Sequence, residues 1–257
     1  MRLTGLLLLI AVTPAAHAQG FVGFGGAIPE ADLLYLAGQP EMAYELLEEH
    51  LATDSTDYEA LWRAARAAVV RGIEQEGSRP QNRWLDPAID YAERAVLARP
   101  DGVDGLYWRG VAAGRRALNA SAGYAVELAQ IVYDDAHAIL AADSLHGGAH
   151  NMLGKLNYEV MSLSRFERAI ARIFMGNAAL NDTSWESAEY HLLMAAEQWP
   201  DFVLFHFDLG QLYRKRGREE EARHSFARAI ELPAVHPTDR SLQVQARLLL
   251  DELGSWF

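Results

Sequence analysis

The chain has 257 residues, of which 50% are hydrophobic and 23% are Asp, Glu, Lys or Arg, a balance typical of a globular protein with a sizeable core. It contains no cysteine, which excludes disulfides, thiolate zinc sites, iron–sulfur clusters and a cysteine nucleophile. The formal net charge of −12 argues against a general nucleic-acid binder, because contacts with phosphates need an excess of Lys and Arg.

The start of the chain has the pattern of a secretory signal peptide. Arg2 precedes an apolar run from Leu3 to Val12, and the small-residue triplet Ala-His-Ala ends at Ala18. A transmembrane helix needs roughly twenty apolar residues, and this run has about half as many. We therefore expect cleavage after Ala18, no transmembrane anchor, and an exported protein that is most simply periplasmic. The Gly-rich segment 19–29 is then predicted to be a flexible leader.

From residue 30 onward, apolar residues recur at spacings of three and four, as in Leu33, Leu36 and Ala37, which is typical of amphipathic helices. No stretch alternates convincingly as a strand. The sequence predicts one helical repeat domain over 30–257. Its helix pairs are expected at 30–53, 57–99, 101–142, 147–199 and 201–232, followed by a capping helix at 238–253.

The pair at 201–232 carries the most regular spacing. It has the offsets of the tetratricopeptide (TPR) repeat in Leu209-Gly210, Tyr213, Ala222, Phe226 and Ala229. Gly210 and Ala222 would allow two helices to approach closely, while Tyr213 and Phe226 would fill the space between them. The corresponding small residues Ala65, Gly110 and Gly154 mark earlier pairs with longer and unequal spacings. We therefore predict an all-α, TPR-like solenoid of helical hairpins with irregular insertions and a C-terminal capping helix.

The irregular segments carry a resemblance to a known family. They are PAIDYAERAV at 87–96, HNMLGK at 150–155, the insertion at 165–174, WESAEY at 185–190 and LPAVHPTD at 232–239. Over about 54–253, this pattern resembles the regulator of microtubule dynamics family. The resemblance implies an all-helical TPR-like domain, and animal members are linked with microtubules and membrane contacts. An exported chain would not meet microtubules, so only the fold is expected to transfer.

A concave groove is the first candidate binding site, because the first helix of each pair lines the inner side of this fold. Counting from the small residues selects Trp62, Arg66, Tyr107, Asn151, Lys155, Tyr158, Phe207 and Gln211. Aromatic and amide side chains on a concave surface suit an extended peptide. For each residue taken alone, ordinary packing between helices is an equally good interpretation.

The insertion at 165–174 is the second candidate site. Phe166, Ile170, Ile173 and Phe174 share one helical face, and Arg165, Arg168 and Arg172 form a neighbouring stripe. In one interpretation the apolar face packs on the solenoid and the arginines are solvated or paired. In the other, the arginines hold a phosphate or carboxylate group while Phe166 and its neighbours cover an acyl chain or a partner helix.

Signals for metal binding or catalysis are weak. His146 and His150 have the spacing of a helical ligand pair, but Gly147-Gly148 between them is expected to break the helix. Asp134, Asp135 and His137 would point in different directions on one helix. The catalytic motifs H-E-x-x-H and G-x-S-x-G are missing from the sequence. We expect no metal, no cofactor and no catalytic residues.

Together these features favour an exported, non-enzymatic scaffold. We expect it to bind an unidentified protein or peptide partner through the concave groove and the insertion at 165–174. The alternative is a carrier of lipid or another apolar ligand that uses the same groove. Charge is unevenly placed, because the segment from Leu3 to Trp62 contains acidic residues and no Lys or Arg, whereas basic residues crowd 214–228.

Overall fold

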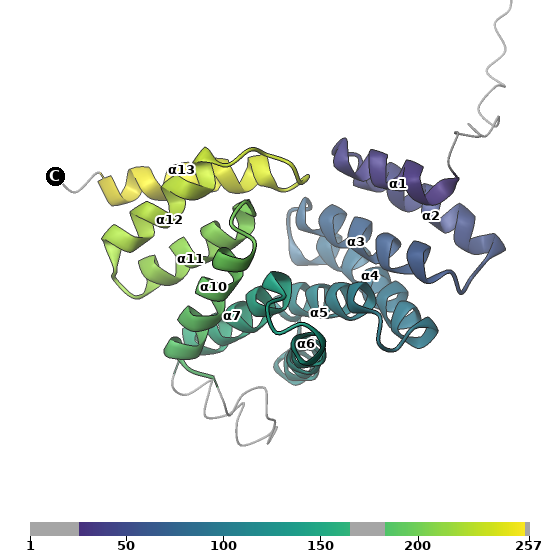
Figure 1. Cartoon of the computed structure of the whole chain (residues 1–257), viewed down its shortest axis with the longest axis horizontal. Coiled ribbons are helices and arrows are strands. Elements are labelled where there is room, and N and C mark those ends of the chain that lie inside the picture. The colour runs from purple at the N-terminus through teal and green to yellow at the C-terminus, as the bar shows by residue number, and fades with distance from the viewer. Residues whose placement is uncertain (1–25, 165–182, 255–257) are drawn as a thin grey trace, which may run out of the picture.

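The computed structural model describes residues 26–164 and 183–254 (Figure 1), and within these ranges it contains eleven helices and no strands. The helices are α1 (Ala27–Leu36), α2 (Pro40–Thr53), α3 (Tyr58–Ile73), α4 (Ser78–Ala98), α5 (Val103–Ala117), α6 (Ala122–Ala142), α7 (Gly147–Ser162), α10 (Trp185–Gln198), α11 (Val203–Lys215), α12 (Glu219–Glu231) and α13 (Asp239–Gly254).

The helices pack as consecutive pairs along an arc. The pairs are α1 with α2, α3 with α4, α5 with α6, α7 with α10, and α11 with α12, and α13 packs on α11 and α12. Each pair also packs on the next one, and α1 and α13 lie at the two ends of the arc (Figure 1). This arrangement confirms the predicted TPR-like helical-hairpin solenoid.

Small residues allow the close helix contacts that the repeat spacing predicts. A Cβ atom on Gly210 would lie 2.6 Å from Cδ1 of Phe226 on the partner helix, and one on Gly154 would lie 2.6 Å from Cγ of Leu192. Gly110 differs, because its missing side chain makes room for Met152 of the next pair. Close approach is therefore needed both within pairs and between them.

The beginning of the solenoid differs from the prediction. Helix α1 begins at Ala27, so the last three residues of the predicted leader at 19–29 are helical. Pro29 lies in the first helical turn, where the backbone N–H that proline lacks would have no partner in the helix. The rest of the predicted leader and the predicted signal peptide lie outside the described residues.

The last helix closes the apolar end of the stack. Ala246 and Leu253 of α13 are buried in a cluster with residues of α11 and α12. The Gln243 side-chain amide donates to the carbonyl oxygens of Ala229, at 3.2 Å, and Leu232, at 2.7 Å. Because the final carbonyls of a helix have no partner within it, Gln243 stabilises the end of α12. Helix α13 therefore covers both the apolar face and the polar end of the last pair.

A pair of histidines joins α7 to α10, where the two hydrophobic clusters of the chain meet. Nε2 of His150 lies 3.1 Å from the Ser144 carbonyl oxygen, which can only accept, so this nitrogen carries the proton. Nδ1 of His150 then accepts from Nδ1–H of His191 at 2.8 Å. Burial, together with the charges of His150 and His137, lowers the pKa of His191 from 6.5 to about 4. In this contact Nδ1–H of His191 is therefore the donor and Nδ1 of His150 the acceptor.

The close approach at Gly210 predicts opposite effects for two glycine substitutions. Gly210→Ala should lower the free energy of unfolding by about 1–3 kcal/mol, because the added methyl group overlaps the Phe226 ring. Gly114→Ala, on α5, should raise it by up to about 1 kcal/mol, because a Cβ there lies 3.5 Å from Val132 and alanine favours the helix. Urea denaturation measures both values. A shift of the same sign in the two variants would contradict this account of the packing.

The His150–His191 contact predicts a loss of stability in acid. Because the folded pKa of His191 is about 4 and its ordinary value is 6.5, the unfolded chain binds the proton first as the pH falls. This group should therefore lower stability between pH 6.5 and 4, by up to about 1.4 kcal/mol per pH unit. In His191→Asn the amide can donate to His150 but cannot titrate, so urea denaturation against pH should give a shallower slope. His224→Asn, the same replacement at an exposed histidine, is the matched control.

Candidate functional site

The first helices of the pairs form the concave side of the arc. Packing links α3 to α5, α5 to α7 and α7 to α11, whereas no comparable packing links successive second helices within the described residues. We call the surface of α3, α5, α7 and α11, with Tyr35 and Asp239 at its rim, the inner face. Burial raises the pKa of Tyr35 to about 12, and nearby Asp239 adds to the shift. The two ends of the arc, α1 and α13, lie near each other (Figure 1).

One polar cluster of the inner face joins α1 to α3. Asp32 accepts from Nε of Arg63 at 2.9 Å and from Nη2 of Arg66 at 2.5 Å. The Arg66 guanidinium also lies 3.9 Å from the centre of the Tyr35 ring, which is a cation–π contact. Trp62 packs beside these arginines and is 8% exposed. The two arginines are thus already paired with a carboxylate of the chain itself.

A second polar cluster joins α7 to α11. The Asn151 amide donates to Oδ2 of Asp208 at 3.0 Å, and Nζ of Lys155 lies 3.2 Å from Oδ1 of the same carboxylate. Burial lowers the pKa of Lys155, but Asp208 and Glu159 outweigh it and hold this pKa above its ordinary value. Lys155 also donates to Gln211 at 3.5 Å. The donor groups of Asn151 and Lys155 are therefore already bound to the buried Asp208 carboxylate.

Aromatic rings fill the inner face between the two clusters. Tyr107 packs against His146, and His146 packs against Trp199 with ring centres 4.9 Å apart. The prediction that Gly147 and Gly148 break the helix is wrong, because they form the first turn of α7. Cβ atoms at these glycines would lie 2.9 Å from the Trp199 ring and 2.6 Å from the Tyr107 ring. The two glycines let these rings pack against the α7 backbone.

The predicted groove residues differ in accessibility. Trp62, Asn151 and Phe207 are buried, whereas the half-buried members are Arg66, Tyr107, Lys155, Tyr158 and Gln211. The structure disagrees with the prediction for Phe207, which is 4% exposed and packs against Phe226 of α12 in the core of its own pair. Phe207 is therefore not available to a ligand.

Three carboxylates of the inner face were missed by sequence reasoning. Asp32 and Asp208 pair with residues far along the chain, so no local pattern indicates them. Asp104 on α5 is exposed and has no hydrogen bond or ion pair within the described part of the chain. Partial desolvation of its carboxyl group and the charge of Glu59 raise its pKa, and Arg63, among others, opposes that shift. Asp104 is thus an unpaired acidic group beside the first polar cluster.

The second candidate site lies outside the described residues. This applies to Arg165, Phe166, Arg168, Arg172 and Phe174 of the predicted insertion. The structure therefore describes the inner face without them.

The histidines and acidic residues considered as metal ligands have separate partners. Nδ1 of His146 accepts from the Ala149 backbone N–H, whereas His150 contacts His191. Asp135 is buried against Arg109, while Asp134 and His137 are exposed. Residues 26–164 and 183–254 hold no group of three or more potential metal ligands. In the same ranges, no helix has the length and apolar character required to cross a bilayer.

The crowded basic residues at 214–228 are mostly paired within the chain. Their partners are carboxylates of nearby helices or, for Asp201, of the turn before α11. The pairs are Arg214–Glu252, Arg216–Glu186, Arg218–Glu189, Arg223–Glu219 and Arg228–Asp201. These exposed pairs keep the helix surfaces solvated and contribute little stability each. The uneven charge of the sequence is therefore largely balanced locally in the last repeat.

Solved structures define the class of protein to which this fold belongs. A thermophilic TPR protein from Thermus thermophilus superposes with a TM-score of 0.59 over 87% of this chain and 97% of its own, at 20% sequence identity. This similarity shows a TPR-like helical repeat protein.

The family follows from the sequence comparisons. The family model described as Regulator of microtubule dynamics protein 1-3 matches residues 27–254, so the chain belongs to this family. Regulator of microtubule dynamics protein 1 from Mus musculus is 23% identical over 228 residues, covering 88% of this chain and 73% of its own. The protein of the same name from Bos taurus is 25% identical over 229 residues, covering 87% of this chain and 70% of its own.

Proposed function

We propose that the chain is an exported, non-enzymatic scaffold whose inner face binds an extended segment of a protein partner. The observation that carries this proposal is the convergence of aromatic and polar side chains on the inner face. The Arg66 guanidinium of α3 lies over the Tyr35 ring of α1, and Tyr107 of α5 packs against His146. The Asn151 amide of α7 donates to Asp208 of α11. A segment that crosses this face would contact helices from several repeats at once.

The charges of the inner face favour a basic partner segment. An acidic segment would have to displace Asp32 from its two arginines, or Asp208 from Lys155 and Asn151. Asp104, in contrast, is free to accept from an incoming Lys or Arg. We therefore expect the bound segment to carry a cation that reaches Asp104, with apolar or aromatic residues against Tyr107 and Tyr158.

The other parts of the proposal rest on the sequence. The pattern that ends at Ala18 supports export, most simply to the periplasm. The apolar face and arginines of 165–174 support a second contact with the partner beside the inner face. The lipid-carrier alternative rests mainly on the same insertion at 165–174. Within residues 26–164 and 183–254, no observation favours it. Native mass spectrometry of protein made in lipid-rich cells separates the two, because a retained lipid mass would favour the carrier.

Paired substitutions test whether the inner face is the binding surface. Peptides selected from a displayed random library should bind Tyr158→Ala/Gln211→Ala roughly ten-fold more weakly than the unaltered chain, because an aromatic contact and an amide contact are lost. Tyr190→Ala/Gln245→Ala removes the same residue types from exposed positions on α10 and α13 and should leave binding unchanged. Isothermal titration gives the affinities, and circular dichroism checks the fold. Equal losses in the two variants would refute the assignment.

The free carboxylate of Asp104 predicts a dependence on charge and pH. Asp104→Asn should weaken a Lys- or Arg-containing peptide several-fold, because the neutral amide loses the ionic attraction. Partial desolvation and the charge of Glu59 raise the pKa of Asp104. Binding should therefore weaken as the pH falls through that raised value, because Asp104 becomes protonated. Asp101→Asn, an equal charge change just before α5, should keep both the affinity and the pH dependence. Identical pH profiles for Asp104→Asn and the unaltered chain would contradict this role.

A further inference from the structure

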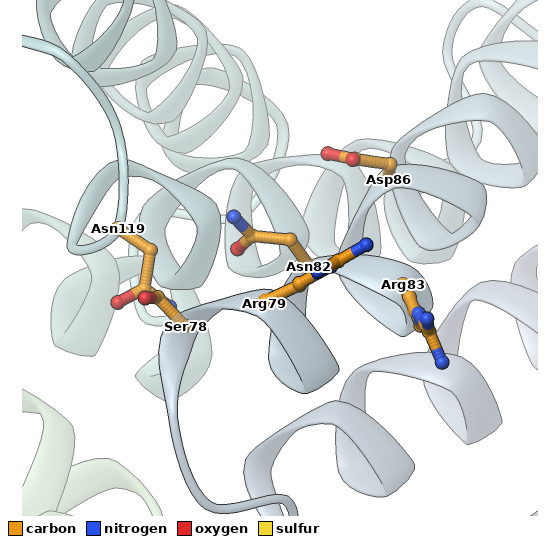
Figure 2. A pocket seen from close by; sticks show the side chains of 6 residues that line it. All are labelled: Ser78, Arg79, Asn82, Arg83, Asp86 and Asn119. Carbon is orange, nitrogen blue, oxygen red and sulfur yellow. The ribbon is translucent and has the colours of Figure 1, made fainter.

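Two adjoining hollows lie where α4 begins and α5 ends, formed by other residues than those of the inner-face clusters. The larger has a volume of about 370 Å³ and is lined by Ser78, Arg79, Asn82, Arg83, Asp86 and Asn119 (Figure 2). The smaller has a volume of about 140 Å³, and Asn119 and Arg115 are among its lining residues. Asn119 lines both hollows, which we together call the α4 hollow.

Three arginines of the α4 hollow have no carboxylate partner. Arg79 and Arg83 are exposed and lie one turn apart on α4, and Arg115 of α5 is half-buried. None of them makes an ion pair or a side-chain hydrogen bond within residues 26–164 and 183–254. Most other arginines of the same ranges do pair with a carboxylate. The α4 hollow therefore concentrates uncompensated positive charge in a chain whose net charge is −12.

The one carboxylate that lines the α4 hollow is already neutralised. Oδ1 of Asp86 accepts from Nε of Arg116 at 2.6 Å. Arg116 also donates to the backbone carbonyl of Asn119 at 3.2 Å, which fixes its side chain at the edge of the hollow. Asp86 therefore does not cancel the charges of Arg79 and Arg83.

Neutral donors add to the arginines. Gly77, with φ of 86°, precedes α4 and gives no side-chain cap, so the backbone N–H groups of Ser78 and Arg79 have no acceptor among the described residues. Such free N–H groups at the start of a helix favour an anion. The buried Oδ1 of Asn82 also has no partner, and an asparagine amide can turn either its oxygen or its nitrogen toward a ligand.

We propose that the α4 hollow binds a small phosphate monoester. Its dianion has three terminal oxygens, which can accept from guanidinium and backbone N–H donors of this kind. The larger hollow lies at the lower end of the range of about 300–1,000 Å³ that is usual for small-molecule sites, so a compact ligand fits better than a polypeptide. Because the net charge of the chain repels a dianion, saturable binding would have to come from the local donors of the hollow.

Phenyl phosphate is the probe for the test, titrated into the full chain by isothermal calorimetry at pH 8. We expect one saturable site whose affinity falls at least roughly ten-fold in Arg79→Gln/Arg83→Gln. The control, Arg240→Gln/Arg247→Gln, makes the same charge change at exposed arginines of α13 and should bind as the unaltered chain does. Phenylacetate, a monoanion of similar size, should bind more weakly.

Three outcomes would overturn the proposal. They are the lack of saturable binding, an equal loss of affinity in the control variant, and binding of phenylacetate as tight as that of phenyl phosphate. The exposed positions of Arg79 and Arg83 make a folding defect in the double variant unexpected, and circular dichroism checks this. Neither arginine belongs to the inner face, so each outcome leaves the proposed peptide site untouched.

Discussion

Each helix pair of this solenoid can bury its apolar face only by stacking against a neighbour, and the rest of the structure depends on this constraint. The stacking requires small residues where helices cross, as at Gly154 against Leu192 and Gly210 against Phe226. Because the first helices also pack on one another, they form the concave side of the arc. The same contacts that build the core therefore bring side chains from distant repeats to one inner face.

Apart from Asp104, the inner face pairs its charged groups with one another. Asp32 joins α1 to α3 through two arginines, and Asp208 joins α7 to α11 through Asn151 and Lys155. Removing a partner from the buried Asp208 would leave an uncompensated charge, and removing one from the partly exposed Asp32 would weaken the link from α1 to α3. These links fix the positions of neighbouring repeats. They also make the inner face a poor site for an acidic segment. The two proposed sites therefore differ in charge preference, because a basic segment suits the inner face and an anion suits the α4 hollow.

The sequence predicts contacts between residues that lie close together in the chain, because their spacing forms a recognisable repeat pattern. The spacing of Gly210 and Phe226 indicates their contact, because both belong to one helix pair. The partners of Asp32 and Asp208 could not be predicted, since they lie 31 and 57 residues away along the chain. At Gly147, intrinsic helix propensity gave the wrong result, because the packing of the Trp199 ring on that backbone outweighs it. The α4 hollow was missed because Asn119, which lies beyond α5 and far from α4 in the sequence, completes it.

Amide chemical-shift mapping of the chain with a selected peptide tests the central claim most directly. It locates the bound segment without removing any side chain. If the inner face binds the partner, the largest shifts should cluster on α3, α5, α7 and α11 and include Asp104 and Tyr158. Shifts confined to the second helices, such as α4, α6 and α10, would contradict the account.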